Sequence, residues 1–157
     1  SYKNQLDEYA PMVIDSLKQC MFYYENYDSY PACAETLALV NFCCGNSTFT
    51  QQDALKLAGA YPILDSNEHL EMTLFLLCDL LGDDDQDNLQ ALFGFFVAAF
   101  SGDLQKLRIT QKTIKEISPF YIKAAQCVGD IREFVLEKLD SDEEKALRFF
   151  NNAQIFK

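Results

Sequence analysis

The amino-acid sequence predicts an all-α protein: a single compact helical bundle of about six to eight helices, with a hydrophobic central helical hairpin, in one domain over residues 1–157. Apolar residues recur at helical spacing along most of the chain, and no stretch alternates convincingly as a strand would. The connections are short and no internal repeat is evident, which favours one bundle over a solenoid. With 157 residues, 49% of them apolar, the chain can bury a core without a metal or a disulfide.

Three helices are predicted before residue 60. The first has Pro11 in its opening turn, where proline is well tolerated, and runs to about residue 27. A turn over residues 28–31 separates it from a second helix over residues 32–44, which ends at a glycine. The third begins at Thr50, followed three residues later by an aspartate, and ends near Gly59.

The next two helices form the predicted central hairpin. The fourth begins at Asp65 or Ser66 and reaches Leu81. The fifth runs from Asp87 to Phe100 and is apolar almost all round. A short helix of this kind is typical of the middle of a bundle, and a short connection makes the two helices antiparallel neighbours.

Three more helices are predicted in the last third of the chain. A short polar helix covers residues 110–117, and a longer one with Pro119 in its first turn covers residues 118–139. Ser141 starts a capping box for a last helix, which ends at Phe150.

Acidic residues are concentrated in the first two thirds of the chain. The net charge is −11; residues 1–105 hold sixteen acidic and three basic residues, whereas residues 106–157 hold eight acidic and ten basic ones. Such a charge distribution repels nucleic acid and anionic membranes, and it accelerates association with basic surfaces. The predicted partner is therefore a basic protein, with no nucleic acid and no membrane.

The fourth predicted helix indicates where such a partner would bind. Six of its residues share an arc of about 120° on a helical projection: Asp65, Glu68, Glu71, Asp79, Met72 and Phe75. An apolar centre ringed by carboxylates is typical of a protein interface. The alternative is that Phe75 is buried in a central helix and the acids lie only toward its solvent-facing ends.

Two further groups of residues extend this candidate surface. The first consists of the aspartates after the fourth helix: Asp83, Asp84, Asp85 and Asp87. Asp83, Asp85 and Asp87 imitate the first three ligands of a calcium loop, but Asn88 stands where that loop needs glycine. Favourable charge at the start of the fifth helix explains these acids better. The second consists of Tyr23, Tyr27 and Tyr30, interleaved with acids as suits recognition of a basic partner; alternatively, two tyrosines of this stretch are in the core.

No catalytic, metal-binding or cofactor-binding motif is found. His69 is the one histidine, and Asp65 lies one turn before it, but a lone histidine near a helix start is more often structural. The six cysteines include no Cys-x-x-Cys pair, and phosphate-binding glycine loops are absent. Neither an enzyme nor a cofactor is therefore predicted.

The chain is expected to be soluble and cytoplasmic. Its longest nearly apolar run, residues 89–100, is shorter than the roughly 20 residues that cross a bilayer, and a secretion signal is absent or already removed. Cys43, Cys78 and Cys127 lie in apolar helical contexts, where a reduced thiol behaves as a small hydrophobe. The alternative is an exported or periplasmic protein with one or two disulfides.

These observations favour a small protein that neutralises a basic partner, of the immunity-protein or toxin-inhibitor type, with a nuclease as one candidate target. A helical adaptor or assembly subunit is the first alternative. The second is a small-molecule or lipid-binding bundle with a cavity lined by Phe93, Phe95, Phe96 and Phe100. A basic cluster could also dock on a second copy and form a homodimer; its members are Lys106, Arg108, Lys112, Lys115 and Lys123. No motif identifies a family.

Overall fold

The computed structural model describes residues 2–23, 30–43, 49–60 and 69–157, without the side chains of residues 2–7, 23, 30, 31, 42 and 43. In these ranges the chain is all-α, which confirms the predicted fold class. The α-helices are α1 (Tyr2–Lys18), α2 (Tyr30–Cys43), α3 (Gln51–Ala60), α4 (Leu70–Leu81), α5 (Gln86–Ala99), α6 (Gln111–Gln126), α7 (Ile131–Lys138) and α8 (Glu143–Asn152). Shorter helical turns are η1 (Gln19–Tyr23), η3 (Leu104–Leu107) and η4 (Ala153–Phe156).

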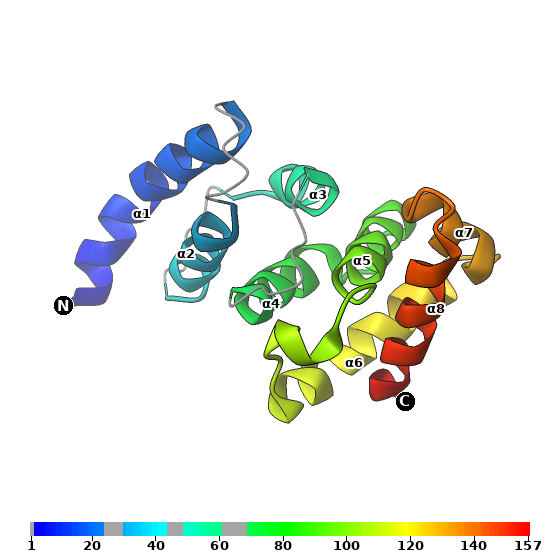
Figure 1. The fold of residues 1–157 in the computed structure, drawn as a ribbon. Coiled ribbons are helices and arrows are strands. Elements are labelled where there is room, and N and C mark those ends of the chain that lie inside the picture. Colours follow the sequence, from blue (N-terminus) through cyan, green and yellow to red (C-terminus); the bar gives the residue numbers. More distant parts are fainter. Residues whose placement is uncertain (1, 24–29, 44–48, 61–68) are drawn as a thin grey trace.

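The helices are stacked in two rows (Figure 1). In one row α4 packs between α2 and α6, and in the other α5 packs between α3 and α7. The helices α2 and α4 run in the same direction, because Glu35 near the start of α2 contacts His69, just before α4, whereas Asn41 near the end of α2 contacts Asp79 near the end of α4. The α4–α5 pair has neighbours on both sides, as predicted for a central hairpin.

The core is built around the phenylalanines of α5 and Phe100, the residue that follows this helix. Phe93, Phe96 and Phe100 are fully buried, and Phe95 is 1% exposed. The Phe93 ring lies 5.4 Å from the Phe134 ring of α7, and the Phe96 ring lies 5.3 Å from the Tyr121 ring of α6. Because these rings pack directly against other rings, the arrangement does not favour a ligand cavity lined by them.

Aspartates cap the amino ends of several helices. The Asp85 carboxylate accepts a hydrogen bond of 3.0 Å from the Asn88 amide in α5, and Asp130 caps α7 in the same way. Asp142 caps α8 by accepting from the Lys145 amide at 3.1 Å. Each such cap stabilises a helix by about 1 kcal/mol. Part of the acidic excess therefore serves the fold.

Both predicted helix starts at proline are wrong, because each proline lies inside a longer helix. Pro11 is inside α1, which already begins at Tyr2, and Pro119 is inside α6. A proline removes one backbone hydrogen bond to the carbonyl four residues earlier. For Pro119 that carbonyl belongs to Lys115, whose exposed position lets water replace the lost donor.

The helix predicted over residues 118–139 is also divided. α6 ends at Gln126, and Asp130 caps a separate α7. The cap of α8 is Asp142 and not Ser141, which has a positive φ of 64° and lies just outside the helix. Polar side chains able to cap a helix stand next to each other here, and only the backbone path decides which one is used.

Among the described residues, no helix combines the length and the hydropathy needed to cross a bilayer.

Cys78 is a buried thiol whose pKa is raised to about 12 by burial and, secondarily, by the charge of Asp79. It thus packs as a small apolar side chain in the core, as predicted.

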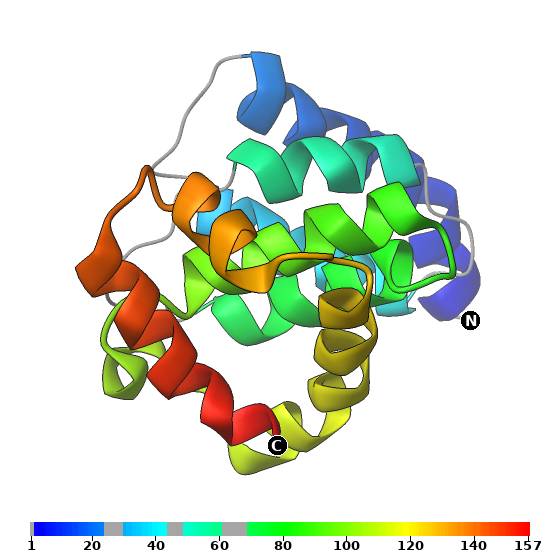
Figure 2. The same ribbon diagram turned by 90° about the vertical axis from the view of Figure 1, so that its right-hand side faces the viewer.

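Figure 2 shows α8 and the carboxyl end on the far side of the bundle from α1.

Candidate partner-binding surface

Exposed aspartates gather at the turn between α4 and α5. We call this group the acidic turn; it consists of Asp79, Asp83, Asp84, Asp85 and Asp87, all exposed to solvent. The structure thus brings together, over nine residues of chain, five of the residues that the sequence predicted for partner binding.

Hydrogen bonds hold the backbone and two carboxylates of the acidic turn in place. Asp83 accepts a 2.9 Å bond from the Gln51 side chain of α3, and bonds of 3.2 and 3.3 Å from the Asp85 amide and the Asn88 side chain. The bond from Gln51, foremost among several causes, lowers the pKa of Asp83 below its ordinary value of 3.8. Sequence reasoning missed Gln51, because nothing local indicates a contact between residues 32 positions apart.

A lysine from the last third of the chain partly neutralises the acidic turn. Lys123 Nζ lies 2.8 Å from Asp84 Oδ1 and donates a 3.1 Å hydrogen bond to the Gly82 carbonyl. No basic residue lies between Lys56 and Lys106 in the sequence, so this contact depends on the packing of α6 against α4. The Asp84 side chain is 98% exposed, and water therefore screens the pair strongly.

The predicted face of α4 is only partly available. Glu71 accepts a 3.0 Å hydrogen bond from the Thr110 amide and a second bond from the Thr113 hydroxyl, so its carboxylate is directed at the amino end of α6. Met72 and Phe75 are half-buried and pack against the core. Asp65 and Glu68, the two other carboxylates of this predicted face, lie outside the described residues.

Asp79 is directed away from Glu71, toward α2. Its Oδ2 accepts a long hydrogen bond of 3.4 Å from the Asn41 side chain. α4 therefore presents one carboxylate to each of its two neighbours in the row, and only Asp79 contributes to the acidic turn. Phe75, which the alternative for this helix placed in the core, is half-buried.

The predicted tyrosine surface falls largely outside the description. Tyr27 lies among the residues that are not described, and Tyr23 and Tyr30 are described by their backbone alone, at the end of η1 and the start of α2. Their part in binding stays a prediction.

The single histidine has a structural setting. The His69 ring contacts the Glu35 carboxylate of α2. The backbone carbonyl of His69 accepts a 3.1 Å hydrogen bond from the Thr73 hydroxyl. Asp65, the residue predicted to orient it, is not described. Within the described ranges no group of three histidine, cysteine or acidic side chains is suited to hold a metal ion.

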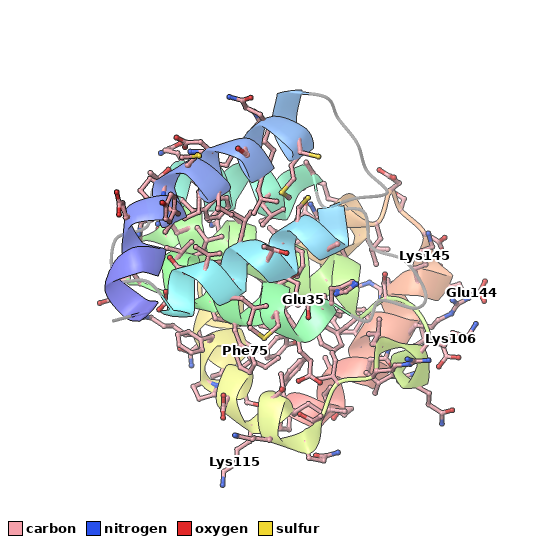
Figure 3. All side chains as sticks on the ribbon, turned by 90° about the vertical axis from the view of Figure 1, so that its left-hand side faces the viewer. Glu35, Phe75, Lys106, Lys115, Glu144 and Lys145 are labelled. Carbon is pink, nitrogen blue, oxygen red and sulfur yellow. The ribbon has the colours of Figure 1, made fainter. Side chains whose placement is uncertain are left out.

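The basic residues of the last third do not form one patch. Lys123 is directed at the acidic turn, and Figure 3 shows Lys106 and Lys115 on separate parts of the surface. Docking of this basic cluster on a second copy of the chain therefore stays a prediction.

No protein-family model, no curated protein and no solved structure matches this chain.

Proposed function

We propose that this protein is a non-enzymatic binding protein that recognises a basic protein partner through the acidic turn. The observation that carries the proposal is the turn itself: five exposed carboxylates over residues 79–87, on a backbone held by hydrogen bonds. Lysine or arginine side chains of a partner would approach these carboxylates from solvent.

A rigid acidic surface suits fast and specific association. Charge of one sign steers a basic partner toward the site, and a turn that is already ordered loses little entropy on binding. The net charge of −11 strengthens this steering at low salt. The narrower form of the proposal is an inhibitor that covers the anion-binding site of a basic target, such as a nuclease, as an immunity protein does.

The proposal is tested by reversing the charge of three carboxylates that cap no helix. In the turn variant, Asp79, Asp84 and Asp87 are replaced by lysine; in the control variant, the exposed residues Glu116, Glu137 and Glu143 are replaced by lysine. Both variants lose the same amount of negative charge. Each is used as bait in a lysate of the source organism, and captured proteins are identified by mass spectrometry.

A basic protein captured by the native chain and by the control variant, but not by the turn variant, supports the proposal. With that protein purified, the association rate of the native chain should fall steeply as salt is raised, and the turn variant should associate at least about tenfold more slowly. Inhibition of the partner's activity distinguishes an inhibitor from an adaptor. Equal capture by the turn variant contradicts the proposed surface.

A further inference from the structure

The last two α-helices expose a large hydrophobic residue beside an apolar groove. Leu147 of α8 is 62% exposed and lines a groove between α7 and α8 with a volume of about 220 Å³. A cavity of about 150 Å³ holds a benzene molecule, so this groove has room for an aliphatic side chain. We call the lining residues the α7–α8 face: Arg132, Leu136, Glu143, Ala146, Leu147 and Phe150. Figure 1 shows α7 and α8 together at the end of the molecule opposite α1.

The core fixes both walls of the groove. Phe149 of α8 is fully buried, and its ring meets the Phe93 ring of α5 edge-on, with the ring centres 6.1 Å apart. The Phe134 ring of α7 lies 5.4 Å from the same Phe93 ring. Both helices are thus anchored on α5, and a partner that binds the groove has little ordering entropy to overcome.

The groove carries one charge of each sign, at opposite ends. Arg132 lies in the first turn of α7 and Glu143 is the first residue of α8, and both side chains are exposed. Figure 2 shows that α7 and α8 run in opposite directions, so their first turns lie at opposite ends of the groove. Neither side chain takes part in an ion pair of the described residues, and both remain available to a partner.

Other charges near the groove do not cancel this polarity. Beside Leu147, Arg148 Nη2 lies 2.8 Å from Glu144 Oε1, so this side of α8 gains no net charge. Lys145, two positions before Leu147, lies on the other side of the helix. Arg132 also borders a wider hollow on the outer side of α7, whose carboxylates are those of Asp130, Glu133 and Glu137. Because Arg132 borders both hollows, a uniformly basic partner would meet a like charge there.

We propose that two copies of this chain form a two-fold dimer through the α7–α8 face. A two-fold axis sets one groove against the other in the opposite direction, so Arg132 of each copy faces Glu143 of the other. Leu147 of each copy enters the apolar part of the other groove. Such an interface needs a protruding side chain and a hollow on the same surface, and the α7–α8 face has both. The dimer is closed, and association stops at two copies.

The dimer stands apart from the proposed function, because the acidic turn lies on neither α7 nor α8. The control variant of the capture experiment carries Glu143→Lys. It is therefore expected to be a monomer with an intact acidic turn.

Charge reversal at the two ends of the groove tests the proposal by sedimentation velocity. Arg132→Glu alone sets two carboxylates against each other at both contacts of a dimer, and Glu143→Arg alone sets two cations against each other. Each variant alone should dimerise at least about tenfold more weakly than the native chain. In an equimolar mixture every contact again joins opposite charges, so the mixture should dimerise as the native chain does. Both positions are exposed, and circular dichroism checks that the variants are folded.

Leu147→Glu tests the apolar part of the interface and should leave the chain monomeric where the native chain is dimeric. The matched controls lie on α6. Ile122→Glu replaces another exposed hydrophobic residue (47% exposed), and Lys115→Glu and Glu116→Arg reverse exposed charges outside the α7–α8 face. All three controls should dimerise as the native chain does.

Five results would overturn the proposal. They are a native chain that stays monomeric up to about 1 mM, native oligomers larger than a dimer, a single charge-reversed variant that dimerises as well as the native chain, a mixture no more dimeric than its components, and an undiminished dimer of the Leu147 variant. A monomeric native chain would leave the α7–α8 face to a different protein.

Discussion

The hydrogen bonds of Glu71 lead to a specific prediction about stability. Glu71 lies in the first turn of α4, and its carboxylate accepts from the backbone amide of Thr110 at 3.0 Å and from the Thr113 hydroxyl. These contacts join residues about 40 positions apart and place negative charge at the amino end of α6, where the helix dipole favours it. Replacing Glu71 should therefore weaken the attachment of α6 to α4.

The expected magnitude follows from the burial of the two donors. A hydrogen bond to a charged group contributes about 1.5–3 kcal/mol. Thr110 is exposed, so water can replace its lost partner. Thr113 is only 3% exposed; its hydroxyl keeps the bond that it accepts from the Thr110 hydroxyl at 3.0 Å, but its own O–H loses its acceptor. We expect Glu71→Ala to lower the free energy of unfolding by about 2–3 kcal/mol, and Glu71→Gln, which keeps one acceptor oxygen, by about 1 kcal/mol.

Urea denaturation followed by circular dichroism measures both values. At about 2–4 °C per kcal/mol for a chain of this size, Glu71→Ala should also lower Tm by about 4–12 °C. Glu116→Ala, at an exposed position of α6, is the control and should change stability by less than about 0.5 kcal/mol. A loss of less than about 0.5 kcal/mol for Glu71→Ala would refute the reasoning and would return Glu71 to the candidate binding surface.

Three other perturbations have expected outcomes. Gly82→Ala should destabilise the protein by more than about 1 kcal/mol in urea denaturation, because a Cβ there would overlap the Cys78 carbonyl and lie 2.5 Å from Cδ1 of Phe120; a neutral result would show that the α4–α5 turn shifts easily. Burial raises the pKa of Asp53, but hydrogen bonds from Lys18 and Thr50 outweigh it and leave the pKa below 3.8, so the carboxylate stabilises the fold at neutral pH and this contribution is lost as pH falls through the lowered pKa. Asp53→Asn should therefore be less stable than the native chain at pH 7 and lose less stability on acidification; parallel acid-unfolding curves would contradict this. Cys78, buried with a pKa of about 12, should react with a thiol reagent at least about tenfold more slowly in the native than in the urea-unfolded protein, and equal rates by mass spectrometry would show that α4 opens readily.

Sequence reasoning succeeded where a structural feature depends on neighbours along the chain. Helix spacing, the short connection after Leu81 and the apolar character of α5 predicted the central hairpin and its burial. Asp85 and Thr110 were placed near helix starts, where they act as caps. The errors lie at the two prolines, at the boundary between α6 and α7, at the cap of α8, and at the start of α4, which begins at Leu70 and not at Asp65 or Ser66. At each of these places several local patterns were compatible with the sequence.

The candidate site could be predicted only in part. The aspartates after α4 follow one another so closely in the sequence that any turn there exposes them together. Whether Glu71 and Asp79 share that surface depends on what packs beside α4, and the structure directs one toward α6 and the other toward α2. Helical projection compares only directions around one helix axis, and it ignores the neighbouring helices that bind the side chains.

By itself the sequence determined the helical class, the burial of the α5 phenylalanines and the clustering of negative charge near residue 83, because side-chain period, apolar run length and residue order need no knowledge of distant contacts. Only the tertiary structure decided that the helices stack in two rows, that Lys123 reaches Asp84, and that Tyr9, Met12 and Val13 of α1 stay exposed. Those features join residues up to tens of positions apart, and their energies depend on which surfaces meet when the helices pack.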